Sequence, residues 1–217
     1  VPVRDGAGAA PLVDAAIAAT ARAHGALVLS EVTDADPGDG TVVADVLGRI
    51  GRANQQGQRV GALATPFRGA VDSLSGPTQE ALRSGSVGVA SNAVPMPGTD
   101  APMAARLAAV GAVPRFFRWA REDRSLDLAE VVRRVTSLPA SLFGLQGRGT
   151  IREGQFADLV VFDRLQIGDR ATAAMPSAYA GGVEYVVVNG VMVLTPQGLT
   201  GARPGRRLVP PGTSDGR

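Results

Sequence analysis

One unit occurs twice near the start of this sequence: an apolar helical stripe, a glycine, and a short apolar run. The first unit predicts a helix with Pro11 in its first turn, a left-handed stop at Gly25 and a strand over residues 26–32. The second unit has its stripe before Gly57, which ends that helix, and a strand over residues 59–67. Helices that alternate with buried strands are typical of a parallel sheet. The sequence therefore predicts an α/β fold.

The middle of the chain predicts less regular structure and then two helices. Residues 74–101 are rich in Gly, Ser and Pro, and within them only residues 86–90 resemble a strand. One helix is expected over residues 104–121. Asp127 begins the other as its N-cap, in a capping box with Glu130. This helix should end near residue 138 and bury a stripe made of Leu128, Val131, Val132 and Val135.

The last third of the chain is β-like. Residues 157–163 form a compact apolar run, and Asn189-Gly190 joins two further runs, which is a strong signal for a hairpin. Asp158 is expected to be structural and to cap backbone N–H groups of the preceding turn. We therefore divide the chain into a partial α/β region (1–150), a small β-sandwich-type module (151–208) and a flexible tail (209–217).

Composition narrows the possible chemistry and partners. The sequence has no Cys, one His, a formal charge of +2, and 22 basic residues that are all Arg. No apolar run reaches the roughly 18 residues of a membrane span, so we expect no membrane partner and a cytoplasmic location. An arginine series with interleaved aromatics keeps a nucleic-acid binder open as a distant alternative, although no nucleic-acid partner is expected. The series consists of Arg115, Arg118, Arg121 and Arg124.

Residues 134–163, RVTSLPASLFGLQGRGTIREGQFADLVVFD, carry a family resemblance. This stretch resembles the closing segment of N-acyl-D-amino-acid deacylases in the amidohydrolase superfamily. The later VxxVVVNGxxV pattern and TGARPGR at residues 200–206 narrow the resemblance to the D-aminoacylase branch. The resemblance implies a partial TIM-barrel-like domain followed by a small C-terminal β module. It also implies a zinc-dependent hydrolase that cleaves the amide bond of an N-acyl-D-amino acid, a small-molecule substrate.

The sequence departs from the family pattern at two positions that the chemistry needs. Where the family has Ser-His, with His a metal ligand, this chain has Ser30-Glu31. Where the family has Ser-Asp, with Asp the general acid/base, it has Ser91-Asn92. The family's H-x-H metal motif would precede Val1. The resemblance thus makes Glu31 a degraded metal-ligand position and Asn92 a degraded acid/base position.

The few residues that could bind a zinc ion or act as a base argue against catalysis by this chain alone. A metal-dependent hydrolase lowers the pKa of a metal-bound water, and its zinc ion takes His, Cys or carboxylate ligands from several strand ends. The only imidazole is His24, which is expected at a helix end, away from the active-site face. An amide such as Asn92 cannot act as a general base. We therefore expect no cofactor in this chain and no activity from it in isolation.

Partners are expected because the strands alone cannot complete the fold. Two or three strands cannot close a barrel, and the VVV and VMV strands should leave an unpaired apolar edge. Another polypeptide or a second copy would then supply the remainder. The alternative is a non-catalytic interaction or regulatory subunit that pairs with an active homologue.

Overall fold

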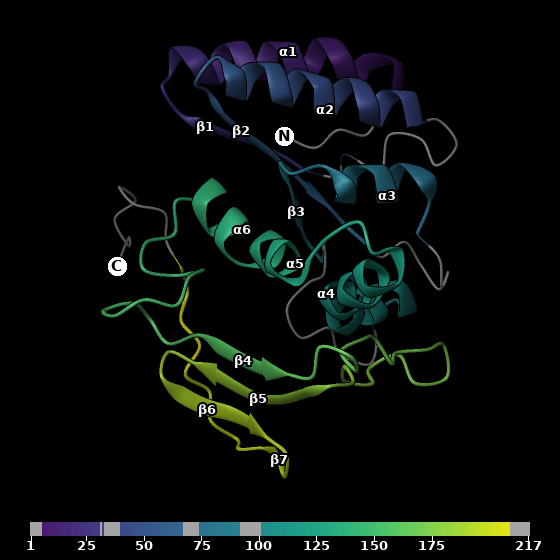
Figure 1. Ribbon diagram of the computed structural model, residues 1–217, viewed down its shortest axis with the longest axis vertical. Coiled ribbons are helices and arrows are strands. Elements are labelled where there is room, and N and C mark those ends of the chain that lie inside the picture. Colours follow the sequence, from purple (N-terminus) through teal and green to yellow (C-terminus); the bar gives the residue numbers. More distant parts are fainter. Residues whose placement is uncertain (1–5, 31, 33–39, 67–73, 92–100, 209–217) are drawn as a thin grey trace.

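The computed structural model describes residues 6–30, 32, 40–66, 74–91 and 101–208, which contain two separate sheets (Figure 1). The first sheet is parallel, with strand order β1-β2-β3, and the second is antiparallel, with order β4-β5-β6-β7. The predicted α/β class is confirmed. The division at residues 150 and 208 stays a prediction, and the predicted tail lies outside the described residues. None of the described helices is long and apolar enough to span a bilayer.

The parallel sheet consists of β1 (Ala26–Leu29), β2 (Arg59–Ala64) and β3 (Val87–Val89). All three predicted strands are present, each shorter than its apolar run. Helices α1 (Gly6–Arg22), α2 (Gly40–Gln55) and α3 (Gly76–Arg83) cover one face of the sheet, and α5 (Leu128–Val135) and α6 (Ser137–Leu142) cover the other (Figure 1). Helix α4 (Met103–Asp123) packs beside α5 and β3.

Helices α1 and α2 end in the same backbone motif. At the end of α2, Gly57 has φ +80°, and its N–H donates to Asn54 O at 3.0 Å, as predicted for the stop. At the end of α1 the prediction was wrong by one residue. His24, with φ +51°, is the left-handed residue, and the N–H of Gly25 closes the motif on Thr20 O at 3.2 Å.

Two other helix starts differ from the sequence prediction. Helix α1 begins at Gly6, so Pro11 lies inside it rather than in its first turn. Residues 74–101 were expected to be least regular, yet they contain α3. Ser75 caps this helix by accepting from Thr78 N at 3.3 Å, and Pro77 lies in the first turn, where a missing N–H costs little.

The predicted helix after Asp127 is two helices. Asp127 accepts from Glu130 N at 2.7 Å, which confirms the N-cap. Helix α5 nevertheless ends at Val135, because Thr136 leaves the helical region (φ −127°, ψ −89°), and α6 follows with Pro139 in its first turn. Leu128, expected to be inward, is 44% exposed. The buried residues of α5 are instead Val131 and Arg134, which are 3% and 1% exposed.

Helix α6 lies directly on the parallel sheet because the sheet has glycines there. A Cβ built on Gly61 of β2 would collide with the Leu142 side chain of α6. A Cβ on Gly88 of β3 would lie 3.3 Å from Arg134 O. Neither glycine has a left-handed φ, so close approach of a helix is the reason for a small residue at each position.

The antiparallel sheet consists of β4 (Leu159–Phe162), β5 (Val183–Val188), β6 (Val191–Thr195) and β7 (Gly198–Leu199). The hairpin is confirmed: Asn189 and Gly190 have φ +47° and +79°. The expected open edge is corrected in part: β5 lies between β4 and β6, whereas β7 pairs with β6 only at Leu194 and Thr195. Asp158 is structural as predicted, but it accepts from Asn189 N (2.8 Å) in the hairpin rather than from the preceding turn.

Candidate functional site

The carboxyl ends of the parallel strands are the candidate site, since active sites of α/β barrels lie at that edge. The strands end side by side there: Leu29 pairs with Ala62, and the N–H of Ala90 donates to Ala64 O at 3.0 Å. Three hydroxyl side chains lie within two residues of these strand ends. Thr65 is 6% exposed, and Ser30 and Ser91 are half-buried.

The two predicted site residues follow directly on these strand ends. Glu31 comes after Ser30 and Asn92 after Ser91, and both lie outside the described residues. Their roles as degraded metal-ligand and acid/base positions therefore stay predictions. Sequence reasoning did place the neighbouring segments correctly, since β1 and β3 both lead into the same edge of one parallel sheet.

The described part of the chain does not fit a zinc site. Within it, no group of three His, Asp or Glu side chains lies close enough to hold a metal ion. His24 is exposed and precedes β1, so it lies at the amino end of the strands, opposite the candidate edge. This agrees with the structural role expected for it.

A charged cluster that the sequence did not reveal lies beside β3. Arg134 Nη1 donates to Val87 O at 2.7 Å and to Leu82 O at 3.2 Å, and its Nε donates to Glu130 Oε1 at 2.5 Å. Hydrogen bonds from Arg133 and Arg134 lower the pKa of Glu130 to about 2. Burial lowers the pKa of Arg134. Because the cluster lies at the amino end of β3, its role is to hold α3, β3 and α5 together rather than to serve the candidate edge.

Arginines of the arginine and aromatic series in α4 form contacts with other parts of the same molecule. Arg115 Nη2 and Arg118 Nη2 lie 2.9 Å and 3.2 Å from the carboxylate of Asp169. Arg121 Nη1 donates to Ile167 O at 2.7 Å. These contacts bind α4 to the segment after β4, and Arg124 ends the helix with φ +60°. Absence of a nucleic-acid partner stays a prediction.

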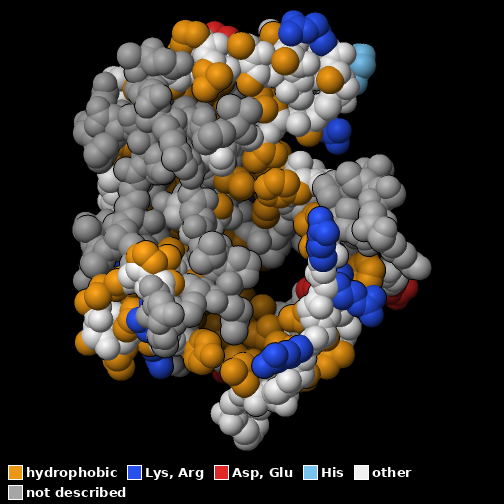
Figure 2. Space-filling model, turned by 180° about the vertical axis from the view of Figure 1, so that it is seen from behind, with side chains coloured by type: hydrophobic (Ala, Val, Ile, Leu, Met, Phe, Trp, Pro, Cys, Tyr) orange, Lys and Arg blue, Asp and Glu red, His pale blue; other side chains and the backbone are white. Residues whose placement is uncertain are grey.

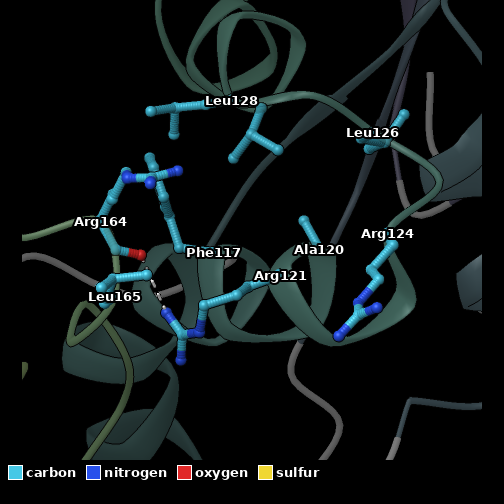
Figure 3. A pocket seen from close by; sticks show the side chains of 9 residues that line it. Phe117, Ala120, Arg121, Arg124, Leu126, Leu128, Arg164 and Leu165 are labelled. Carbon is cyan, nitrogen blue, oxygen red and sulfur yellow. Dashed lines mark hydrogen bonds between the residues drawn. The ribbon is translucent and has the colours of Figure 1, made fainter.

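An open pocket of about 240 Å³ lies at the end of α4 (Figure 3). It is formed by α4, the residues that lead into α5, and Arg164-Leu165 after β4. Sequence reasoning missed it, because these segments meet only through the tertiary fold and none carries a binding motif.

Comparison with known proteins gives a match to one family over part of the chain. Residues 88–194 match the Amidohydrolase family. The chain is 45% identical over 91 residues to N-acyl-D-glutamate deacylase from Alcaligenes xylosoxydans xylosoxydans, which is 42% of this chain and 18% of that protein. It is 42% identical over 100 residues to D-aminoacylase from the same organism, 46% of this chain and 21% of that protein.

Solved structures share the fold over nearly the whole chain. A crystal structure of D-aminoacylase superposes with a TM-score of 0.72 and 21% identity, over 90% of this chain and 52% of that one. N-acyl-D-glutamate deacylase from Bordetella bronchiseptica, complexed with zinc and a phosphonate inhibitor, gives a TM-score of 0.71 and 23% identity, over 92% and 53%. The chain thus spans about half the length of these structures and about a fifth of the relatives matched by sequence.

Proposed function

We propose, because residues 88–194 match the Amidohydrolase family, that this chain is one part of a hydrolase that cleaves N-acyl-D-amino acids. The support is the set of relatives matched at 39% to 45% identity, which are deacylases of N-acyl-D-glutamate, D-amino acids and N-acyl-D-aspartate. The bond hydrolysed would be the amide between the acyl group and the amino acid nitrogen.

We propose that β1, β2 and β3 are three successive strands of a TIM-like barrel, with β4 to β7 forming a following β module. Parallel pairing in sequential order supports this, since the strands of such a barrel pair in chain order. The proposed parts are the barrel region (1–150), the β module (151–208) and the tail (209–217).

The observation that carries the proposal is that the parallel sheet is open on both sides. In the described part of the chain, β1 and β3 each pair with β2 alone, whereas a barrel of this class needs eight strands. The metal that relatives bind would supply an activated water, but the described residues do not fit its ligand set. We therefore propose that the isolated chain is inactive and that the zinc ligands come from other barrel strands.

The partner that completes the barrel is proposed to be another polypeptide or a second copy. The face seen in Figure 2 has apolar side chains gathered across its middle. Outer strand β4 also exposes Val160 and Val161, at 53% and 51%, on its two opposite sides. The same open edges leave a second candidate, a non-catalytic subunit that binds a complete active homologue. The cytoplasmic location stays a prediction.

Release of amino acid from N-acetyl-D-glutamate and N-acetyl-D-leucine tests the proposal. The purified chain with added zinc should release no more than a zinc-only control. Mixing with a polypeptide that carries the complementary half of a D-aminoacylase should produce metal-dependent release and a stable complex on size-exclusion chromatography. Release by the chain alone contradicts the proposed inactivity. A stable complex with a complete homologue, and none with the half, would favour the regulatory subunit.

A further inference from the structure

The pocket at the end of α4, the α4 pocket, has a rigid apolar floor. Phe117, Ala120 and Val131 form it and are 7%, 3% and 3% exposed, so they are part of the core. The ring of Phe117 meets that of Phe162 edge-to-face, with 5.2 Å between ring centroids. An apolar group that enters the pocket would thus contact preformed core surface and leave water.

The rim of the α4 pocket is cationic. Three of its lining side chains are Arg121, Arg124 and Arg164, and none of its lining residues is Asp or Glu. Arg121 Nη1 donates to Arg164 O at 3.4 Å, which attaches the Arg164-Leu165 wall to α4 (Figure 3). Arg164 lies on the wall opposite Arg124, with Phe117 between them (Figure 3). Arg124 and Arg164 are exposed and pair with no acidic side chain in the described part of the chain.

The carboxylates next to this rim accept hydrogen bonds from backbone groups, and the charge of one of them, Asp163, also acts on Arg164. Asp127 accepts from Glu130 N at 2.7 Å, and Asp163 accepts from Leu165 N at 2.8 Å. A backbone hydrogen bond from Leu165, a side-chain hydrogen bond from Gln166 and the charge of Arg164 lower the pKa of Asp163, so it remains an anion. Since neither Arg124 nor Arg164 forms an ion pair within the described residues, their N–H groups can donate to an external anion, with the charge of Arg164 partly balanced by Asp163.

We propose that the α4 pocket binds a small amphipathic carboxylate. Its carboxylate would lie at the rim, where guanidiniums can donate paired hydrogen bonds, and its apolar group would lie on the Phe117 floor. The pocket of about 240 Å³ is smaller than the roughly 300–1,000 Å³ typical of drug-sized ligands, so a short chain or single ring fits. Binding needs neither a metal nor a completing partner, so this inference stands apart from the proposed hydrolysis.

Titration of the full 217-residue chain, followed by ¹⁵N NMR, tests this pocket with three probes. Hexanoate has both required features, acetate has only the charge, and hexanol has only the apolar chain. Hexanoate should shift the amides around Phe117, Leu126 and Leu165. Acetate and hexanol should bind at least about tenfold more weakly, since each lacks one of the two contributions. Equal binding of hexanoate and hexanol, or hexanoate shifts confined to other regions, overturns the proposal.

Variants separate the pocket from general attraction to a basic protein. Arg124→Gln/Arg164→Gln should weaken hexanoate binding about tenfold, whereas the control Arg152→Gln, at an exposed arginine outside the pocket, should leave it unchanged. Leu165→Glu places a carboxylate at the rim from a residue that is 66% exposed and should abolish binding while the amide spectrum stays dispersed. Unchanged affinity in the double variant or in Leu165→Glu contradicts the assignment.

Discussion

The carboxylate of Glu130 lies between two guanidiniums, with Arg133 Nε at 2.6 Å and Arg134 Nε at 2.5 Å. Arg134 is buried and donates onward to the carbonyls of Leu82 and Val87. The carboxylate of Glu130 thus pairs with Arg134, and the hydrogen bonds of Arg134 link α5 to the end of α3 and the start of β3. A buried guanidinium is tolerated here because its charge is paired and several of its N–H groups are hydrogen-bonded.

Acid should weaken this link. Hydrogen bonds from Arg133 and then Arg134 lower the folded-state pKa of Glu130 to about 2, from 4.5. A lowered carboxyl pKa stabilises the fold above the unfolded-state value, and that stability is lost as pH falls from about 4.5 toward 2. The difference in the free energy of unfolding between wild type and Glu130→Gln should shrink by on the order of 2 kcal/mol between pH 6 and pH 2. Urea denaturation measures it.

The matched control for the pH experiment is Glu122→Gln, at an exposed glutamate of α4. Its difference from wild type should stay small and vary little over the same pH range, because a surface carboxyl contributes little to stability. A Glu130→Gln difference that is equally flat with pH would show that the arginine pair does not stabilise the ionised carboxyl.

At the residue scale, the sequence predicted a role correctly where the hydrogen-bond partner is close in sequence. It did not predict contacts between residues that are far apart in sequence. The N-cap at Asp127 follows from a neighbouring residue, whereas Asp158 is structural through Asn189, 31 residues away, and not through the preceding turn as expected. The burial of Arg134 does not follow from neighbouring residues either, since the carbonyls that receive its hydrogen bonds lie 47 to 52 residues away in sequence. Glu31 and Asn92 lie outside the described residues, so their assignments rest on the family resemblance alone.

At the scale of elements, the strand and helix order followed from apolar periodicity, and the hairpin from its turn residues. The break between α5 and α6 did not, because Thr136 departs from helical geometry within a continuous helix-like pattern. Helix α3 was hidden because its Gly, Ser and Pro suggest a loop, although Ser75 and Pro77 are favourable at a helix start. The close packing of α6 on the sheet depends on Gly61, which sequence alone did not single out.

Substitution of Gly61 by Ala should destabilise the fold, because the added methyl group would occupy the position of Leu142. We expect a loss of about 1–3 kcal/mol, typical of overpacking in a core. Gly51→Ala is the matched control. It lies within α2 with no atom within 4 Å of the added Cβ, and it should stabilise by about 0.5–1 kcal/mol. Thermal and urea unfolding of both variants measure the two effects.

A double-mutant cycle assigns the Gly61 effect to the contact with α6. Leu142→Ala makes room for the new methyl group, so Gly61→Ala should cost less in that background, with a coupling energy of about 0.5–3 kcal/mol. Additive effects would mean that α6 does not press on β2 as described.

At the scale of the whole molecule, two sheets with open outer strands share the fold of about half of a D-aminoacylase. Within the described residues, β1 and β3 pair with β2 alone, and the single His of the sequence precedes β1 rather than following a strand. A zinc site of a hydrolase draws imidazoles and carboxylates from several strand ends, and the described residues gather no such group, which agrees with the proposal that the ligands lie on other barrel strands. Completion of the barrel and binding of the metal are therefore one event in this account.

Zinc content of the isolated chain, measured by mass spectrometry after dialysis against trace zinc, tests this account most directly. The metal should dialyse away from the chain alone and should be retained only when a complementary half-barrel is present. Retention of one zinc ion per monomeric chain, without any partner, would contradict it.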